Sequence, residues 1–259
     1  MYAKKSLGQH FLRSEKALKT IIEAGEIKQG ETVLEIGPGE GTLTEKLLES
    51  GAKIIAVEKD DELFEFLKQK FGDQITLVHD DILNFQTSEL PTYKLIANIP
   101  YNITGAILKK FLSEENPPTK MVLLVQKEVA ERIIARPRHG VSGYGKESVL
   151  SISVKAYGEP KLIEKVLAGS FAPAPKVDSM IISINNISKD FFKNFSEKSF
   201  FQMLKAGFQS KRKKLSSNLS NIFDKNTVET AFKKLNLDEN VRAEDIDIEM
   251  WKKLADCLI

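Results

Sequence analysis

The sequence predicts an α/β fold in which a mostly parallel sheet is covered on both faces by helices, followed by a small helical domain. Strand-like apolar runs alternate with helical patterns as far as Ile184, which is typical of parallel βαβ units. One of these units joins its strand to its helix through a glycine-rich turn at 37–41. From about residue 188 the sequence reads as short amphipathic helices without a strand signal. We therefore place two domains at 1–187 and 188–259.

The bulk composition is that of an ordinary globular protein. The chain has 259 residues, 42% hydrophobic and 29% charged, which is enough for one large domain and a small one. Cys257 is the single cysteine, so an internal disulfide and a cysteine-based metal cluster are excluded, as suits a reducing cytosol. His10, His79 and His139 lack metal-ligand spacing, and we expect no metal. Without a signal-peptide pattern or a run of roughly 18 apolar residues, we expect a soluble, cytoplasmic protein with no membrane partner. We also expect a monomer.

Basic residues gather in three separated clusters, although the formal net charge is only +2. Each cluster alone is typical of a solvated face, but the three together favour a polyanion such as nucleic acid lying across the folded surface. The clusters are Lys4, Lys5, Arg13, Lys16 and Lys19; Lys205, Lys211, Arg212, Lys213 and Lys214; and Arg136, Arg138, His139 and Lys146.

An irregular arm at 4–12 precedes the first helix, which Ser14 can cap and which continues through Leu18 and Ile22. The arm combines glycine, glutamine and histidine with phenylalanine and leucine. Two interpretations remain open for it: the arm folds over a ligand, or it only tethers the N-terminus.

The glycine-rich turn follows a strand at 32–36 and begins a helix that continues through Leu48. Strand, glycine turn and helix indicate a nucleotide-binding half-fold, because glycine lets the backbone approach a ligand closely. The next strand, 53–57, ends at Glu58, which is 21 positions after Gly37. An acid about 20 positions on is placed to meet ribose hydroxyls. The third glycine falls one place early for a dinucleotide fingerprint, so a nucleoside ligand is the better prediction.

Acidic side chains follow the third predicted strand. A helix at 61–71 leads to this strand, 75–78, which ends at His79-Asp80-Asp81-Ile82. Residues past the carboxyl end of a parallel strand face the ligand crevice, so Asp81 is placed to accept from an adenine amine while Ile82 packs on the ring. A helix or turn cap is the alternative interpretation of the same acids.

The fourth strand is an apolar run that begins at Leu95 and stops at Asn98, before a proline and an aromatic ring. Asn98 offers a side-chain carbonyl, and Pro100 leaves the Ile99 carbonyl outside any helical ladder. Tyr101 adds a flat aromatic face. Two acceptors beside a stacking surface suit a planar group with an exocyclic amine, such as adenine. A plain strand-to-helix turn with a half-buried Tyr101 is the alternative.

The remaining elements complete the sheet and form the helical region. They are strands at 121–125, at 162–166 and through Ile184, and helices at 128–135, 147–157, 200–208, 215–223, 228–235 and 248–258. The glycine-rich, basic stretch 141–146 predicts a flexible loop. Prolines stiffen the connection that follows Phe171, so this loop presents Phe171 from a fixed position.

Seven stretches together identify a family resemblance. They are Lys-Lys-Ser-Leu-Gly-Gln-His-Phe-Leu at 4–12, Glu-Ile-Gly-Pro-Gly-Glu-Gly at 35–41, Val-Glu-Lys at 57–59, Asp-Asp-Ile at 80–82, Asn-Ile-Pro-Tyr at 98–101, Phe-Ala-Pro-Ala-Pro-Lys-Val-Asp-Ser at 171–179 and Phe-Gln-Ser-Lys-Arg-Lys-Lys-Leu at 208–215. Along nearly its whole length the chain resembles the ribosomal RNA adenine dimethyltransferases, most closely the bacterial small-subunit (KsgA/RsmA) type. The resemblance implies a Rossmann-like class I S-adenosylmethionine-dependent methyltransferase fold, with a mostly parallel seven-stranded sheet and a helical C-terminal rRNA-binding domain.

The resemblance also implies roles for individual residues. Glycines of the turn back the methionine end of S-adenosylmethionine, Glu58 takes its ribose hydroxyls, and Asp81 contacts its adenine. Many relatives carry asparagine where this chain has His10. The implied cofactor-binding residues are His10, Leu12, Gly37, Gly39, Gly41, Glu58, Asp81, Ile82 and Asn98. The implied catalytic residues are Asn98, which reaches the target amine, and Tyr101 and Phe171, which hold the target base.

The implied activity is N6,N6-dimethylation of two adjacent adenosines in the 3′-terminal hairpin of 16S rRNA, in the 30S particle and coupled to small-subunit biogenesis. Three alternatives stay open: an Erm-type enzyme that methylates 23S rRNA and confers macrolide resistance, a non-catalytic RNA-binding assembly factor, and a dinucleotide oxidoreductase. The stretches at 171–179 and 208–215 favour the small-subunit type. The misplaced third glycine argues against the oxidoreductase.

Overall fold

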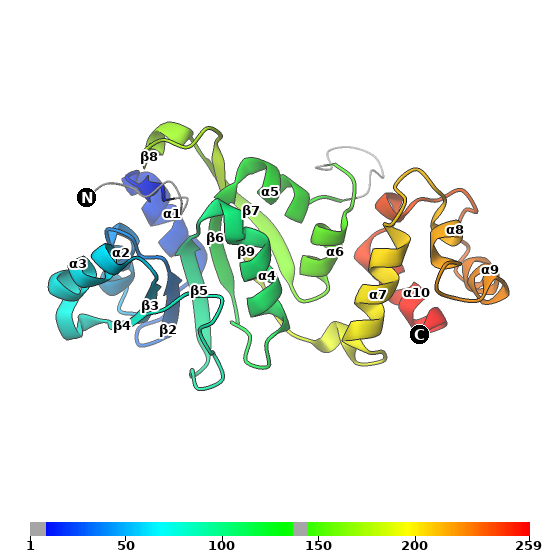
Figure 1. Ribbon diagram of the computed structural model, residues 1–259, viewed down its shortest axis with the longest axis horizontal. Helices are drawn as coiled ribbons and strands as arrows, with labels where there is room; N and C mark the ends of the chain where they lie inside the picture. Colours follow the sequence, from blue (N-terminus) through cyan, green and yellow to red (C-terminus); the bar gives the residue numbers. More distant parts are fainter. Residues whose placement is uncertain (1–8, 137–144) are drawn as a thin grey trace. The chain divides into compact units, whose positions relative to one another are not determined.

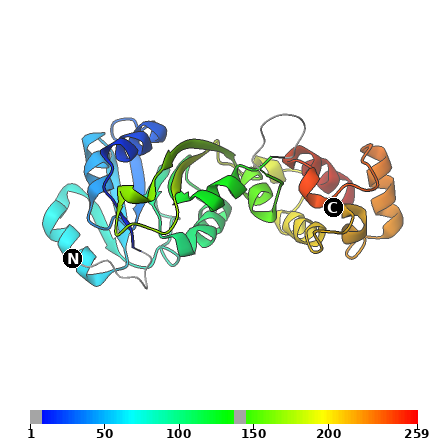
Figure 2. The same ribbon diagram turned by 90° about the horizontal axis from the view of Figure 1, so that it is seen from above.

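A computed structural model describes residues 9–136 and 145–259, which divide into two compact units (Figures 1 and 2). The first unit consists of the chain up to Ala130 together with Glu159–Ile187. The second consists of Glu131–Gly158 and Ser188–Ile259. The segment 131–158 thus differs from its sequence-based assignment to the first domain. The helical pattern of 147–157 predicts a helix but does not say which core its apolar side joins.

The first unit is built on a seven-stranded sheet with the strand order β4-β3-β2-β5-β6-β9-β7 (Figure 1). The five strands from β4 to β6 are parallel, whereas β9 runs antiparallel to both β6 and β7. The sheet is therefore mostly parallel, as the sequence predicts. The strands are β2 (Thr32–Ile36), β3 (Lys53–Glu58), β4 (Thr76–His79), β5 (Tyr93–Asn98), β6 (Met121–Gln126), β7 (Glu159–Val166) and β9 (Ser179–Asn185).

Helices of the first unit follow the strands. They are α1 (Glu15–Gly25), α2 (Thr42–Glu49), α3 (Asp61–Phe71), α4 (Thr104–Ser113) and α5 (Lys127–Ile133). Helix α5 begins in the first unit, and its residues from Glu131 onward belong to the second. Ser14 caps α1 as predicted, since its hydroxyl accepts from Ala17 N. Apolar side chains of α1, α2 and α3 share one core with the sheet, including Ile21 and Ile96. Helix α4 has no counterpart in the sequence-based prediction.

A second, two-stranded sheet joins segments that are far apart in the sequence. β1 (Phe11–Leu12) pairs antiparallel with β8 (Phe171–Ala172), with Leu12 opposite Phe171. Arg13 N also donates a 2.8 Å hydrogen bond to Ser170 O. The N-terminal arm is thereby attached to the loop between β7 and β9. This pairing was not predicted, because a two-residue strand leaves no periodic signal.

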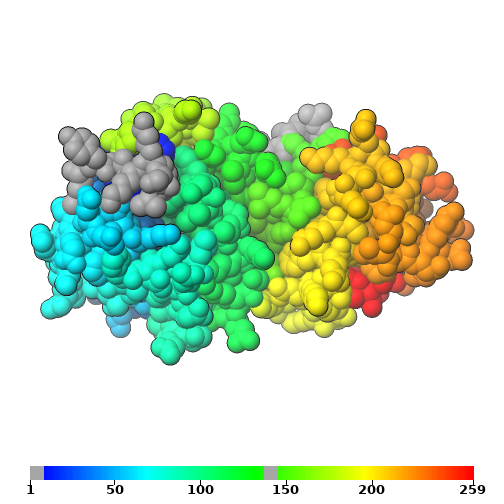
Figure 3. Space-filling view, in the orientation of Figure 1, coloured from blue at the N-terminus to red at the C-terminus, as the bar shows by residue number. Residues whose placement is uncertain are grey.

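Helices around one aromatic core form the second unit (Figure 1). They are α6 (Val149–Lys155), α7 (Glu197–Gly207), α8 (Leu215–Leu219), α9 (Lys225–Lys234) and α10 (Ile248–Leu258). Trp251 and Phe200 are fully buried in this core, and Ile152 of α6 belongs to it as well. On the face shown in Figure 3 the side chains of α7 to α9, in yellow and orange, form a continuous surface.

Short 3-10 helices complete the described secondary structure: Gly72–Gln74, Tyr101–Ile103, Ala168–Ser170, Asp190–Phe192 and Ala243–Asp245. Within the described ranges, every helix is too short or too polar to cross a membrane. The sequence-based expectations for Lys4, Lys5, Arg138, His139 and the first part of the loop 141–146 lie outside the described residues.

Candidate active site

A cavity of about 250 Å³ opens where β2, β3 and β5 end, and it belongs entirely to the first unit. Side chains past the carboxyl ends of parallel strands converge at such a place. The arm contributes a further wall through residues 9–12. The lining residues are 9–12, 35–40, 42–43, 57–59, 63, 80–83 and 98–103. Nearly every predicted cofactor-binding residue is among them; Gly41 is not.

Two glycines of the turn face the cavity in a backbone conformation that side chains disfavour. Gly37 has φ +59° and Gly39 has φ +61°. A Cβ atom on Gly39 would lie 3.0 Å from the ring of Phe11, so the arm packs directly on this turn. Gly37 N donates to Val57 O at 2.9 Å and ties the turn to β3. The turn can therefore expose its backbone to the cavity in this conformation because both positions are glycines.

Gly41 has a packing role beside the cavity. It has φ +79° and stands at the N-cap of α2. A Cβ atom there would lie 2.5 Å from the ring of Phe71, which comes from α3. The helix pair α2 and α3 can therefore approach only if this residue has no side chain. A direct contact between Gly41 and a cofactor stays a prediction.

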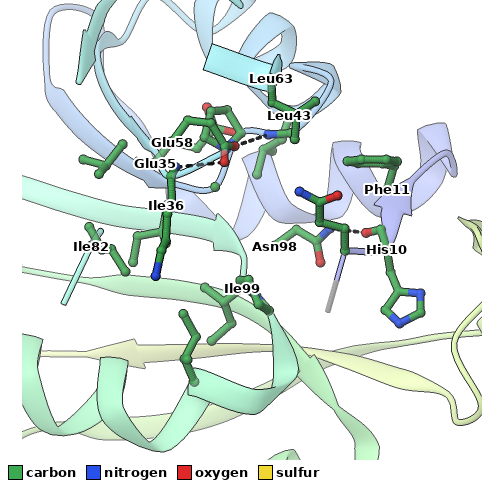
Figure 4. Close-up of a pocket in the computed structure, with 18 of the residues that line it drawn as sticks. His10, Phe11, Glu35, Ile36, Leu43, Glu58, Leu63, Ile82, Asn98 and Ile99 are labelled. Atoms are coloured by element: carbon green, nitrogen blue, oxygen red, sulfur yellow. Dashed lines mark hydrogen bonds between the residues drawn. The ribbon is translucent and has the colours of Figure 1, made fainter. Parts of the chain in front are cut away.

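Glu58 connects the end of β3 to the glycine turn (Figure 4). Its Oε2 accepts from Gly39 N at 3.2 Å, and its Oε1 accepts from Lys59 N and Asp60 N at 2.9 Å each. A carboxylate offers about four acceptor positions, so capacity remains for a ligand hydroxyl. Burial raises the pKa of Glu58 above its ordinary value, although the three backbone N–H groups act in the opposite direction.

Glu35 is a buried carboxyl group at the floor of the cavity that the sequence analysis did not single out as a site residue. It lies in β2 and is 1% exposed, and its Oε2 accepts a 2.7 Å hydrogen bond from Thr44 Oγ1. Burial, together with the neighbouring charge of Glu58, raises the pKa of Glu35 to about 8. A glutamate within a fully buried strand was the signal in the sequence that could have identified it.

Asp81 and Ile82 line the cavity on the side of β4. Asp81 Oδ1 accepts from Leu83 N at 2.9 Å, and Oδ2 accepts from Lys59 Nζ at 2.8 Å. The Lys59 ammonium and the Leu83 N–H hold the pKa of Asp81 below its ordinary value, so this side chain is a carboxylate and an acceptor. Ile82 is buried beside it and offers an apolar surface.

Asn98 is the last residue of β5 and lies opposite the arm (Figure 4). Its Nδ2 donates a 3.0 Å hydrogen bond to His10 O. Ile99 and Pro100 stand between the strand and the next 3-10 helix, so the Ile99 carbonyl belongs to neither element. Both expected acceptors, the amide oxygen of Asn98 and the carbonyl of Ile99, therefore come from one wall of the cavity.

Tyr101 is a half-buried ring held at its polar end and on its flat side. Its hydroxyl and Ser179 Oγ are 2.6 Å apart, and its ring stacks with the imidazole of His10, with centroids 5.6 Å apart and an interplanar angle of 22°. Burial raises the pKa of Tyr101, so the phenol is neutral at physiological pH. The ring is thus a fixed aromatic surface next to Asn98.

His10 and Leu12 reach the cavity from the arm, and their contact with a cofactor stays a prediction. His10 Nδ1 lies 2.8 Å from Pro173 O, so the imidazole is bonded to the loop that follows β8. Leu12 is 2% exposed, and its carbonyl accepts a 3.2 Å hydrogen bond from Thr42 Oγ1. Residues 9–12 of the arm therefore form part of the cavity wall, and folding of the arm over a ligand stays a prediction.

Phe171 does not line the cavity. Its side chain is 5% exposed and belongs to the core that contains Leu12 and Val166. The proline-stiffened loop contacts the cavity wall through another residue, because the Pro173 carbonyl oxygen accepts a hydrogen bond from the His10 side chain. A contact between Phe171 and a target base stays a prediction, and it requires a rearrangement of this ring.

Two of the basic clusters differ in how far their charges are paired. In the first, Arg13 and Lys16 form ion pairs with Glu40 and Glu164. In the second, the side chains of residues 211–214 are exposed, and none of them takes part in an ion pair with a described residue. The turn 211–214, between α7 and α8, therefore offers unneutralised positive charge to solvent. In the described part of the chain no three His, Cys, Asp or Glu side chains are grouped so as to hold a metal ion.

Comparison with known families gives one match across the chain. A profile of the ribosomal RNA adenine dimethylase family matches residues 1–259. Ribosomal RNA small subunit methyltransferase A of Dehalococcoides mccartyi (strain CBDB1) is 40% identical over 98% of this chain and 87% of its own length. The protein of the same description from Clostridium botulinum (strain ATCC 19397 / Type A) is 39% identical over 98% of this chain and 93% of its own length.

Two solved structures share the fold over nearly the whole chain. The 23S rRNA methyltransferase ErmE is 26% identical with a TM-score of 0.78, and the match covers 96% of this chain and 99% of that one. A dimethyladenosine transferase from Plasmodium falciparum is 28% identical with a TM-score of 0.79, and the match covers 95% of this chain and 96% of that one. The expected class I methyltransferase fold with a helical C-terminal region is confirmed.

Proposed function

The chain belongs to the ribosomal RNA adenine dimethylase family, and from that premise we propose that it dimethylates two adjacent adenosines in 16S rRNA. It is an rRNA adenine methyltransferase. The methyl donor is S-adenosylmethionine, and the target adenosines lie in the 3′-terminal hairpin. The substrate is the 30S subunit or its precursor, so the reaction accompanies small-subunit biogenesis in the cytoplasm. The protein acts as a monomer.

One observation supports the proposal best. Asn98, Ile99 and Tyr101 lie in the same cavity as the glycine turn and Glu58. An adenine amine needs acceptors for its two N–H bonds and a flat surface for its ring, and this wall supplies both. A nucleoside-containing donor needs acceptors for its hydroxyls and a close backbone, and the opposite wall supplies these. The two ligands would therefore meet at Asn98.

The residues of the cavity fit S-adenosylmethionine. Glu58 has acceptor capacity left for ribose hydroxyls, and the Asp81 carboxylate is an acceptor for the adenine amine. Ile82 offers an apolar face for the adenine ring. Gly37 and Gly39 carry no side chain, and their backbone lines the cavity, where it can contact the methionine part. When bound, S-adenosylmethionine supplies an electrophilic methyl group on a sulfonium.

Residues at the end of β5 prepare the nucleophile. The lone pair of the adenine amine is delocalised into the ring, which makes the nitrogen a poor nucleophile. When Asn98 Oδ1 and the Ile99 carbonyl accept its two N–H bonds, they favour the pyramidal nitrogen that attacks. Holding this nitrogen in line with the methyl group then gives most of the acceleration. Asn98 cannot ionise, and no general base is required because the proton can leave after transfer.

The target base has to be presented out of its stack, either from a loop or by flipping. Stacking on Tyr101 stabilises the extruded base by about 1–3 kcal/mol. The Tyr101 ring is already fixed by Ser179 and His10, so little of that gain is lost to ordering the side chain. Phe171 would add a second aromatic contact if it left its core position on RNA binding.

Exposed cations hold the RNA backbone. The turn 211–214 carries four positive charges, free of ion pairs with described residues, that can contact phosphates. Contacts of this kind release counterions, so binding weakens as salt concentration rises. Together the two units supply chemistry and RNA affinity, and the second unit acts as the rRNA-binding domain.

The nearest alternative is methylation of 23S rRNA, as in ErmE, which shares the fold. Identity of about 40% with small-subunit methyltransferases, against 26% with ErmE, favours the small-subunit substrate. The test is to incubate the protein with labelled S-adenosylmethionine and either unmodified 30S subunits or unmodified 23S rRNA. Mass spectrometry then locates the modified nucleotide and counts its methyl groups. Product on 23S rRNA alone contradicts the proposal.

A non-catalytic assembly factor with the same fold is a second alternative. The acceptors and the stacking ring of the cavity argue against it, because RNA binding alone does not require them. Calorimetry with S-adenosylmethionine separates the two, since an assembly factor that had lost the activity has no need to bind the donor. The same titration with NAD tests the dinucleotide oxidoreductase, which the early third glycine disfavours.

A further inference from the structure

The side-chain amide of Asn98 is oriented by a backbone group of the arm. Asn98 Nδ2 donates a 3.0 Å hydrogen bond to His10 O. A peptide carbonyl only accepts, so the amide nitrogen has to face it and the amide oxygen points the other way, as Figure 4 shows. In the ranges that the structure describes, no group donates to that oxygen. The acceptor is therefore left for a ligand.

Reversing this amide would reverse the hydrogen-bonding character of the site. The oxygen and the NH₂ group of asparagine are similar in size, so packing alone does not select between the two orientations. In the reversed orientation the NH₂ group would face the target amine, which is also a donor. The oxygen would then face the His10 carbonyl, which is also an acceptor. Only the observed orientation can accept from an adenine amine.

The carbonyl that orients Asn98 is itself held by the loop after β8. His10 Nδ1 lies 2.8 Å from Pro173 O, and because that oxygen only accepts, Nδ1 carries the hydrogen. The next residue, Phe11, pairs with Ala172 in the two-stranded sheet. The imidazole ring also stacks on Tyr101. His10 is thus attached to the loop through both its backbone neighbour and its side chain.

We propose that His10 is a positioning residue for methyl transfer. Its imidazole N–H, bonded to Pro173 O, fixes the backbone carbonyl that turns the Asn98 oxygen toward the target amine. The same ring stacks on Tyr101, but the positioning role belongs to the N–H and not to the ring. This inference rests on the proposed function and adds to it a group that touches neither the methyl nor the amine.

Two substitutions at His10 separate its N–H from its ring. His10→Asn keeps a donor near the position of Nδ1 but removes the ring, whereas His10→Phe keeps a ring against Tyr101 but has no donor. We expect His10→Phe to lower kcat about tenfold or more, the upper range for one hydrogen bond, with KM for S-adenosylmethionine and for RNA changed less than about threefold. We expect His10→Asn, which keeps the donor, to recover most of the kcat that His10→Phe loses. Equal losses in both variants, or an unchanged kcat in His10→Phe, overturn the proposal.

A second measurement reads the Asn98 amide without using activity. In ¹⁵N-labelled protein the Asn98 side-chain signals are assigned by their absence from Asn98→Ala. We expect their exchange with solvent to be slow in wild type and in His10→Asn, and to approach that of the exposed Asn84 amide in His10→Phe. His10→Leu is a second donor-free variant should His10→Phe fail to fold. Equal protection in the donor-free variants and in wild type overturns the proposal.

The two measurements keep the inference and the proposed function apart. If wild-type protein methylates no rRNA, the proposed function fails, and the exchange data still decide whether His10 orients the amide. If wild type is active and the Asn98 protection does not depend on the His10 donor, only the positioning role fails.

Discussion

Thr44 Oγ1 donates a 2.7 Å hydrogen bond to Glu35 Oε2 in a place from which solvent is almost completely excluded. The bond connects the first turn of α2 to the carboxyl end of β2, at the cavity. The hydrogen bond from Thr44 favours the ionised form of Glu35, but the loss of hydration outweighs it, and the pKa of Glu35 rises to about 8. A carboxyl group that is neutral at pH 7 therefore lies at the floor of the cavity.

This relationship predicts that the folded protein loses stability as pH rises. Below the ordinary pKa of 4.5 both states of Glu35 are protonated, and above it only the unfolded chain releases the proton. The free energy of unfolding should then fall between about pH 5 and about pH 8, by up to about 1.4 kcal/mol per pH unit. Glu35→Gln keeps an acceptor for Thr44 but cannot ionise, so its decline should be shallower. Denaturant unfolding at several pH values measures both, and identical slopes contradict the prediction.

Asn98→Ala should abolish methylation while the fold stays intact. The substitution removes the acceptor for the target amine but no core contact, since Asn98 lies at the open end of β5. Incorporation of labelled methyl groups into 30S subunits measures activity, and thermal unfolding checks the fold. Asn84→Ala, at an exposed asparagine, is the matched control. Turnover of Asn98→Ala at the wild-type rate would show that the amide has no part in catalysis.

Tyr101→Ala should likewise abolish methylation, because the base loses the surface on which it stacks. Tyr101→Phe keeps the ring and loses only the contact with Ser179 Oγ, so it should retain activity within about tenfold of wild type. Single-turnover methylation of the two variants separates stacking from hydroxyl chemistry. Equal loss in both would mean that the hydroxyl, and not the ring, is what the reaction requires.

The triple variant Lys211→Ala, Arg212→Ala, Lys213→Ala should weaken RNA binding and flatten its salt dependence. Each phosphate contact that is lost reduces the slope of log K against log salt concentration by about 1. Titration of the 3′-terminal hairpin RNA at several salt concentrations measures the slope. A control that removes Lys225, Lys233 and Lys234 from α9 changes the net charge equally. If both variants have the wild-type slope, the turn 211–214 is not part of the RNA-binding surface.

Gly41→Ala should destabilise the first unit by about 2–4 kcal/mol, from backbone strain and from overlap with the Phe71 ring. Gly30→Ala is the control for strain alone, because Gly30 has φ +81° and a Cβ atom added there would have no neighbour within 4 Å. Chemical denaturation compares the two variants. If Gly41→Ala costs no more than Gly30→Ala, the packing of Phe71 does not require a glycine, and contact with the donor becomes the better explanation for Gly41.

The sequence by itself determined the α/β class, most strands and helices, and several of the groups that line the cavity. Asn98, Tyr101, Glu58 and Asp81 could be identified because each ends or follows a strand whose hydrophobic pattern is clear. The carboxyl ends of parallel strands meet at one edge, so local patterns are enough to bring these residues together. Glu35 lay within such a strand, and its side chain was overlooked among apolar neighbours.

Only the tertiary structure decided which distant segments meet. The pairing of Phe11 and Leu12 with Phe171 and Ala172, the core position of Phe171 and the packing of α6 with the C-terminal helices each depend on contacts between residues far apart in the chain. Periodicity reports the face that an element buries but not the element that covers it. The orientation of the Asn98 amide belongs to the same group, because it is set by a carbonyl 88 residues earlier in the sequence.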